Sequence, residues 1–301
     1  MLIVGALICT TLWGSAYPSI KTGYLLFDIP AADSAAQILF AGCRFTLAGI
    51  MAMIAGSFIQ RKVLIPKKAS LPKIGLLCLL QTVVQYVFFY ISLAHMTGVK
   101  SSILSSISVF FSLIFAVYIF RQEKMTMNKL LATIVGFTGI IIVNLGGDFS
   151  LDFHLLGEGF MILSSISYTF STIFLKIFSK DEDPVILSGC QFIVGGIIMI
   201  IIGLLMGGHF GQVTPSGLCL LLYMAFISAA AYSLWGILLK YHPVTKVTIF
   251  TFTTPIFGVI LSGIILGEYD QIMKIQNLIA LVMVCCGIYL MNHVGTKKAA
   301  A

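Results

Sequence analysis

Two pairs of side chains in this chain have the types and spacing needed to bind a small molecule. Trp13 and Tyr17 are four residues apart, and so are Gln81 and Gln85. Residues four apart on a helix lie on one face, so each pair would present its groups in one direction. Aromatic rings provide apolar walls, N–H and O–H donors, and faces that hold ammonium groups. Both pairs therefore indicate a binding surface.

Other aromatic and hydroxyl side chains extend this surface. A stripe of serines runs from Ser101 to Ser112 in steps of three or four, and Thr248 and Thr251 repeat it later. For any one of these residues, helix packing or an interfacial aromatic belt is a competing explanation. We expect a cavity lined by Trp13, Tyr17, Gln81, Gln85, Tyr86, Tyr90, Ser105, Ser108, Tyr168, Tyr232, Trp235 and Thr251.

Arg44 is the only charged residue near the middle of an apolar run. Placing an arginine there costs about 2.5–3.5 kcal/mol on insertion scales, so it needs a partner or water. One interpretation is a contact to a substrate carboxylate. The other, which we favour, is a structural or gating anchor bonded to helix-end carbonyls or a nearby acid. Pro18 and Pro255 also lie within runs, where a missing backbone hydrogen bond favours a bend or hinge.

The sequence contains no group of residues with the spacing of a catalytic or metal site. Acidic and histidine residues fall near the ends of apolar runs or between them, and the cysteines form neither CxxC nor Cys/His ligand spacing. The phosphate-binding pattern G-x-x-x-x-G-K-[ST] is also absent. We therefore expect no catalytic residues, no metal and no cofactor, and we rank a membrane enzyme low. ATP-driven activity of this chain alone is excluded.

The composition is that of an integral membrane protein. Of the 301 residues, 59% are hydrophobic and only 10% are charged, whereas soluble domains average about 25% charged residues. The net charge of +7 fits Lys and Arg gathered in cytoplasmic loops better than it fits nucleic-acid binding. The expected partners are therefore the lipid bilayer and a small-molecule substrate, without nucleic acid, and the expected state is a monomer or homodimer.

Apolar runs long enough to cross a bilayer as helices recur along the whole chain. They lie at about 2–20, 35–57, 73–95, 98–120, 127–146, 157–179, 185–207, 216–239, 244–266 and 275–294. Strands are excluded as spans, because the runs are apolar all round and do not alternate. Most Lys and Arg fall in alternate connections, which places both termini in the cytoplasm. The first run exceeds the roughly 7–15 apolar residues of a signal peptide, so we expect it to be retained.

The two halves of the sequence repeat each other. Gly42-Cys43-Arg44-Phe45 returns as Gly189-Cys190-Gln191-Phe192, and Tyr86 and Tyr232 occupy equivalent positions. Five helices in each half is an odd number, so the second half must cross the membrane in the opposite sense. We therefore predict an all-α integral membrane protein with ten transmembrane helices as two inverted five-helix repeats, residues 1–146 and 147–301.

Several motifs resemble the EamA-type proteins of the drug/metabolite transporter superfamily. They are Trp13-Gly14-Ser15-Ala16-Tyr17 followed by Lys21, the mid-helix Arg44, the stretch from Ser101 to Glu123, and Thr254-Pro255 through Gly267-Glu268. The resemblance implies a carrier in which helices 1, 3, 4, 6, 8 and 9 surround a cavity and helices 5 and 10 lie outside. The first half has Val109-Phe110 where the second has Pro255, so the fourth and ninth helices are not expected to bend equally.

The function expected from this resemblance is export of small metabolites such as amino acids across the bacterial cytoplasmic (inner) membrane, by alternating access. No carboxylate relay is visible in mid-helix, which favours facilitated or weakly coupled transport. A nucleoside, sugar or other solute carrier of the same fold is the alternative, and a membrane sensor that transports nothing is less favoured.

Overall fold

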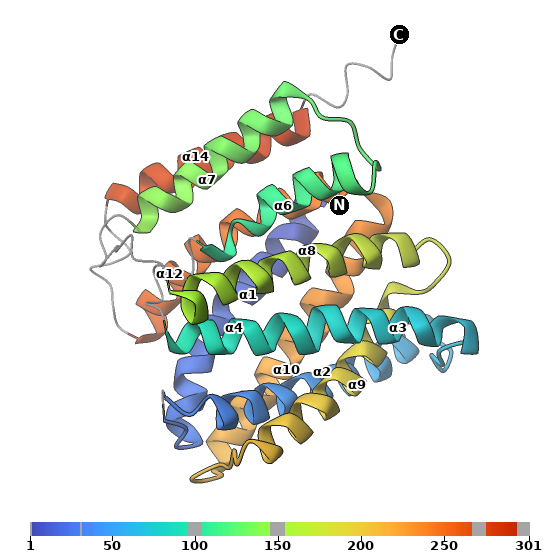
Figure 1. Cartoon of the computed structure of the whole chain (residues 1–301), viewed down its shortest axis with the longest axis vertical. Coiled ribbons are helices and arrows are strands. Elements are labelled where there is room, and N and C mark those ends of the chain that lie inside the picture. The colour runs from blue at the N-terminus through green and yellow to red at the C-terminus, as the bar shows by residue number, and fades with distance from the viewer. Residues whose placement is uncertain (1, 31, 96–103, 145–153, 267–274, 294–301) are drawn as a thin grey trace.

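The computed structural model describes residues 2–30, 32–95, 104–144, 154–266 and 275–293, and every regular element in these ranges is a helix (Figure 1). The first half contains α1 (Leu2–Leu26), α2 (Ser34–Gln60), η1 (Lys68–Ser70), α3 (Leu71–Leu77), η2 (Cys78–Val84), α4 (Gln85–Ala94), α6 (Ser108–Ile114), η3 (Phe115–Ile119) and α7 (Met127–Asn144). The second half contains η4 (Leu155–Gly159), α8 (Phe160–Phe178), α9 (Pro184–Leu205), α10 (Pro215–Tyr241), α11 (Val244–Thr248), η5 (Ile249–Phe252), α12 (Thr253–Leu266) and α14 (Ile275–His293).

Six helices of the described chain have the length and hydropathy of membrane spans. They are Leu2–Leu26, Ser34–Gln60, Lys68–Ser92, Leu155–Phe178, Pro184–Leu205 and Pro215–Tyr241, with shorter apolar helices at Ser108–Ile119 and Leu281–Met291. Their outer faces carry exposed apolar side chains, among them Phe58 and Leu204. Lipid is the medium in which such faces are stable. The all-helical membrane character expected from the sequence is confirmed, while the ten-span inverted repeat stays a prediction.

Corresponding helices of the two halves begin with the same capping chemistry. The Asp33 carboxylate accepts a hydrogen bond from Ala36 N at 2.9 Å at the start of α2, and the Asp183 carboxylate accepts one from Val185 N at 2.8 Å at the start of α9. An aspartate at this position satisfies an N–H that the helix itself leaves unpaired. The two ends are therefore fixed by local sequence.

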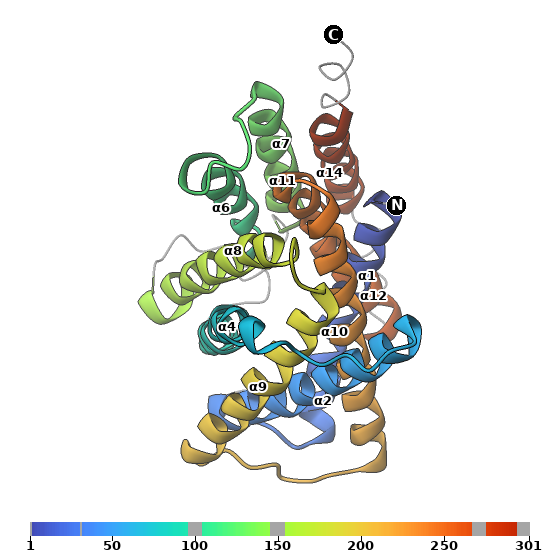
Figure 2. The ribbon, with the colours of Figure 1, turned by 90° about the vertical axis from the view of Figure 1, so that its right-hand side faces the viewer.

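The packing of the helices is also paired. α2 packs on α9 and α7 packs on α14, and these two pairs lie at opposite ends of the molecule in Figure 2. Between them, α1 contacts α12 and α10, while α8 contacts α6 and α4. If α1 is matched with α8, each contact of α1 with a second-half helix has a counterpart in a contact of α8 with a first-half helix.

Glycines in the repeated motif and a few residues after it allow α2 and α9 to approach closely. A Cβ atom on Gly49 would lie 2.5 Å from the Gly189 carbonyl oxygen, and one on Gly42 would lie 2.8 Å from that of Gly196. Small residues let membrane helices bring their backbones together in this way. The motif that marks the repeat therefore lies where α2 and α9 cross.

The fourth and ninth helical segments are both interrupted, although only the ninth contains a proline, and their unequal bending stays a prediction. The ninth changes from α11 to the 3₁₀ helix η5 just before Pro255. The fourth turns at residues 106–107, where Ile107 N bonds Leu104 O at 3.1 Å and Val109 N bonds Ser106 O at 3.1 Å. These i→i+3 bonds tighten the chain without a proline. In contrast, α1 continues through Pro18 from Leu2 to Leu26, so no helix break marks the hinge expected there.

Candidate functional site

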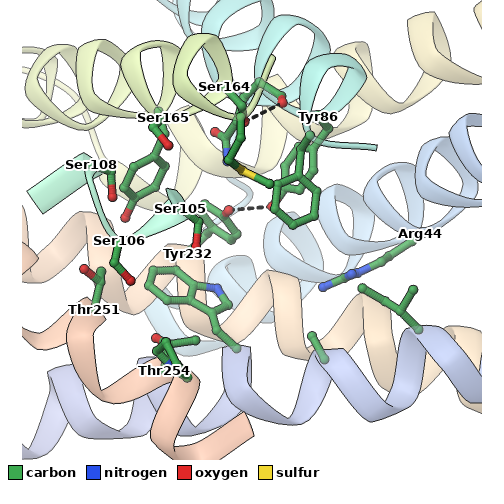
Figure 3. A pocket seen from close by; sticks show the side chains of 18 residues that line it. Arg44, Tyr86, Ser105, Ser106, Ser108, Ser164, Ser165, Tyr232, Thr251 and Thr254 are labelled. Carbon is green, nitrogen blue, oxygen red and sulfur yellow. Dashed lines mark hydrogen bonds between the residues drawn. The ribbon is translucent and has the colours of Figure 1, made fainter. Parts of the chain in front are cut away.

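A cavity of about 170 Å³ lies between the two halves (Figure 3). Its walls come from α1, α2, α4, α6 and the turn before it, α8, α10, η5 and α12. The lining residues are Trp13, Ala16, Ile20, Arg44, Gln85, Tyr86, Phe89, Ser105, Ser106, Ser108, Met161, Ser164, Ser165, Tyr168, Tyr232, Thr251, Thr254 and Pro255.

Most of the side chains expected at the cavity are among these lining residues. They are Trp13, Gln85, Tyr86, Ser105, Ser108, Tyr168, Tyr232 and Thr251, together with Arg44 and Pro255 from the expected gating set. The aromatic members form one cluster, because the Trp13 ring lies 5.2 Å from that of Tyr232 in an edge-to-face arrangement. Residues far apart in the sequence thus build a single wall.

Three of the expected residues do not line this cavity. Gln81 is fully buried and its side-chain oxygen accepts a hydrogen bond from Gln191 Nε2 at 3.2 Å, so it faces α9. Tyr90 packs in the core beside α2. Trp235 lies behind Trp13, with the ring centroids 4.8 Å apart. Pro18 is also absent from the lining, and the side chain of Tyr17 lies outside the described residues.

The expectation also missed part of the wall, mainly on α8. Met161, Ser164 and Ser165 line the cavity there. Ser164 Oγ also donates to the Gln85 carbonyl at 2.9 Å, which fixes α8 against α4. Ser164 and Ser165 lie four and three residues before Tyr168, so the spacing rule used for the other pairs would have found them. The other missed positions are Ala16, Ile20, Phe89, Ser106 and Thr254.

Two tyrosines from equivalent positions meet at the cavity. The hydroxyl oxygens of Tyr86 on α4 and Tyr232 on α10 are 2.6 Å apart. Elsewhere in the lining, Trp13 Nε1 and Thr254 Oγ1 are buried and bond no group of the described chain. Buried donors of this kind are costly unless something pairs with them. The cavity therefore offers hydrogen-bonding groups beside aromatic surface.

Arg44 is fixed to α10 and also faces the cavity. Its Nε donates to Ser228 Oγ at 3.0 Å and to the Met224 carbonyl at 3.3 Å. The residue is only 4% exposed, yet it belongs to the cavity wall and its guanidinium points inward in Figure 3. No ion pair found in the described ranges involves it. Among the described lining residues Arg44 is the one that carries a charge, so the cavity is positive.

Gln191, which replaces Arg44 in the second half, makes a matching contact. Its side-chain oxygen accepts a hydrogen bond from Thr82 Oγ1 at 2.5 Å. Thr82 lies four residues before Tyr86, as Ser228 lies four before Tyr232. The Arg44–Ser228 and Gln191–Thr82 hydrogen bonds therefore occupy equivalent positions in the two halves, but only the first involves a charged side chain.

Polar contacts close the molecule at the end where α6 and η3 lead into α7. The Glu123 carboxylate accepts hydrogen bonds from Thr245 Oγ1 at 2.5 Å and Thr245 N at 3.2 Å, and pairs with Lys129 Nζ at 2.7 Å. Nearby, Lys176 Nζ donates to the carbonyls of Leu239 and His242. These hydrogen bonds join the end of the fourth helical segment to α11 and join α8 to the end of α10.

Two ionisable groups in the connections at this end have shifted pKa values. The neighbouring Ser70 hydroxyl and the Lys73 ammonium, which donates to Glu182 Oε1, lower the pKa of the Glu182 carboxyl, and burial opposes them. Burial lowers the pKa of His242, and the charges of Lys176 and Lys246 add to this effect. Both shifts follow from the packing of connections against helix ends.

Comparison with known proteins agrees with this architecture. The model of the EamA-like transporter family matches residues 1–145 and 155–293. The uncharacterized transporter YvbV of Bacillus subtilis is 22% identical over 297 residues, which cover 96% of this chain and 91% of YvbV. An uncharacterized transporter of Synechocystis is 34% identical over 140 residues, 46% of this chain and 41% of its own.

A solved crystal structure has the same fold. It superposes with a TM-score of 0.78 over 96% of both chains, at 11% identity. The names of the matching family and of the relatives indicate a transporter, not an enzyme. The apolar helices indicate a multi-pass membrane protein. This chain belongs to the EamA-like transporter family.

Proposed function

We propose that this transporter carries small amphipathic metabolites of the amino-acid class by alternating access. The observation that carries the proposal is the cavity between the two halves, where the equivalent residues Tyr86 and Tyr232 meet. In transporters built from inverted repeats, the substrate site lies at the interface of the repeats near the bilayer midplane. The paired helix contacts support such a repeat of ten spans.

The size and lining of the cavity favour a small substrate. Its volume of about 170 Å³ is well below the roughly 300–1,000 Å³ of sites for drug-sized ligands. Aromatic rings of Trp13 and Tyr86 would cover an apolar side chain, while hydroxyls such as Ser108 and Thr251 would bond its polar group. Nucleosides and sugars remain the alternative, because the same hydroxyls suit them.

The distribution of contacts supports an outward-facing state. Ile20, Phe89 and Met161 line the cavity near the helix ends opposite the Glu123–Thr245 link. Basic residues gather at the end that holds this link, for example Arg61 and Lys180. Under the positive-inside rule this end is cytoplasmic. The Glu123 contacts would then form the closed inner gate of an exporter in the bacterial inner membrane, with both termini inside.

A transport assay tests the proposal directly. Purified protein in liposomes loaded with an unlabelled amino-acid mixture should accumulate trace labelled amino acid by counterflow, and empty liposomes should not. A parallel thermal-shift screen of amino acids, nucleosides and sugars separates the two substrate classes, since a ligand that binds the folded state stabilises it. Flux of nucleosides or sugars alone would favour the alternative, and no flux of any solute would favour a sensor.

Coupling to protons is a separate point. In the described part of the cavity wall no carboxylate or histidine is present, and such groups are the usual relays in proton-coupled carriers. We therefore propose facilitated or weakly coupled transport. Net transport into proteoliposomes should persist when an ionophore collapses the pH gradient, and its abolition would contradict the proposal.

A further inference from the structure

We propose that Arg44 binds a carboxylate of the transported molecule and that its contacts on α10 hold it in position to do so. This inference rests on the carrier function proposed above. It extends the structural role expected from the sequence, because the same side chain both anchors a helix and faces the cavity.

The charge of Arg44 lacks a balancing protein charge. The residue is 4% exposed within the span Ser34–Gln60, and no ion pair among the described residues includes it. Charged side chains inside membrane proteins pair with one another or with backbone carbonyls, or they mark substrate pathways. The Met224 carbonyl and the ring of Phe45, 5.3 Å from the guanidinium carbon, stabilise the cation only in part. A bound anion would complete the neutralisation.

The geometry leaves donors directed at the cavity. A guanidinium has five N–H donors in a planar fork, and the two bonds to α10 use Nε alone. Tyr90 also interacts with the guanidinium, from the core side of α4. The remaining donors suit the two oxygens of a carboxylate, which arginine binds in bidentate fashion.

The second half of the chain shows that packing does not require this charge. Gln191 occupies the equivalent position and makes the equivalent contact to Thr82, but it is fully buried and does not line the cavity. A neutral amide is therefore enough to join the two helices. The arginine adds charge only where the side chain reaches the cavity.

The rest of the cavity defines the other features of the ligand. In Figure 3, Arg44 lies on one side, Ser106, Ser108 and Thr251 lie on the other, and Tyr86 and Tyr232 lie between them. The matching ligand class is a small molecule with a carboxylate at one end, an apolar middle and a hydrogen-bonding group at the other. Amino acids and hydroxy acids both belong to it.

The test uses ligands that differ only in the carboxylate. Leucine and phenylalanine, each compared with its amide and its decarboxylated amine, are added to the purified full-length protein, and affinity is measured by thermal shift and calorimetry. Binding of at least one acid about 10- to 100-fold tighter than its amide is expected, the range for a charged hydrogen-bonded pair. Equal binding of acid and amide, or binding of no acid, would overturn the inference.

Variants separate recognition from packing. Arg44→Gln should keep the fold, because Gln191 makes the same link, and should remove the preference for acid over amide. Arg44→Lys keeps the charge but loses the planar fork, so it should retain part of the preference. Gln191→Leu breaks the equivalent packing contact and should lower thermal stability while leaving the preference intact. Loss of stability without loss of preference in Arg44→Gln would assign the residue to structure alone.

Failure of this inference can be told apart from failure of the carrier function. If the wild-type protein catalyses counterflow of neutral solutes and shows no acid preference, the carrier function stands and the role of Arg44 falls. If the protein moves no solute, the carrier function itself fails.

Discussion

The hydroxyl oxygens of Tyr86 and Tyr232 lie 2.6 Å apart, although the residues are 146 positions apart in the sequence. Each occupies the same place in its half of the chain, and each lines the cavity. If the two halves are inverted repeats, as we propose, residues that touch their own repeat partners lie close to the axis that relates the halves. In a carrier that rocks one half against the other, this contact lies where the two halves move least.

The two single variants that each remove one of these hydroxyls should together lower the free energy of unfolding by more than the double variant does. Tyr86→Phe or Tyr232→Phe leaves the other buried hydroxyl without its partner, at a cost of about 1–3 kcal/mol, whereas the double variant removes both groups. A double-mutant cycle on thermal unfolding in detergent should therefore show coupling. Tyr118→Phe, on an exposed side chain, is the control and should change little. Strictly additive effects would mean that the hydrogen bond contributes nothing.

The crossing of α2 and α9 predicts a sharp difference between glycines. Gly49→Ala would place a methyl group 2.5 Å from the Gly189 carbonyl oxygen, so backbones must separate and stability should fall by about 1–3 kcal/mol or more. Gly75→Ala on α3 meets no atom within 4 Å and should be neutral or stabilising by up to about 1 kcal/mol, because alanine favours helices. Thermal unfolding of both variants measures the difference. Similar melting temperatures would contradict the close approach.

Residue type within the apolar runs, a local property of the sequence, predicts much of the cavity wall. Tyr86, Tyr168 and Tyr232 are expected as aromatic residues in these runs and Trp13 also by its i, i+4 spacing, and all four line the cavity. Gln81 was assigned by the same rule and faces α9 instead. The rule assumes an α-helix, but Cys78–Val84 is π-helical and Gln85 N bonds Leu80 O, five residues back. This bonding changes the register in which Gln81 and Gln85 would share a face.

The remaining differences come from tertiary packing, which a single sequence does not encode locally. The turn at residues 106–107 forms without proline, so no residue type in the sequence marks it. Trp235 is an aromatic residue of the type expected in the cavity wall, but it lies behind the ring of Trp13. Which of two neighbouring aromatic rings reaches a cavity depends on how far apart the helices lie, and that distance is set by contacts such as Gly14 against α12.

The lowered pKa of His242 predicts a pH-dependent stability. Burial and the charges of Lys176 and Lys246 favour the neutral ring in the folded state, so the unfolded chain takes up the proton first as the pH falls. Stability should therefore decline as the pH drops below about 6.5, the ordinary pKa, and be fully present above it. His242→Gln should flatten this part of the thermal-stability profile, while His209→Gln, on an exposed residue, should not. An unchanged slope in His242→Gln would assign the dependence to other groups.

The link between Glu123 and Thr245 should control opening at the end of the molecule that holds it. Glu123→Gln keeps the size of the side chain but removes the charge that pairs with Lys129 and accepts from Thr245, at a cost of about 1–3 kcal/mol to the closed arrangement. Since Ser112 is fully buried between this link and the cavity residue Ser108, a Ser112→Cys reporter should react faster with a water-soluble thiol reagent in the Glu123→Gln background.

Modification at position 112, quantified by peptide mass spectrometry, distinguishes gate opening from a general loss of charge. Asp181→Asn is the matched control, because its carboxylate lies at the same end but is 79% exposed and 4.0 Å from Lys73. Exposed pairs of this kind contribute about 0–1 kcal/mol, so this variant should leave the labelling rate unchanged. An alternating-access carrier is closed at one end while it is open at the other. Faster labelling together with weaker ligand binding to the outward-facing cavity would therefore identify Glu123 as part of the inner gate. Equal labelling in wild type and Glu123→Gln would instead make it a stabilising contact that persists throughout the cycle.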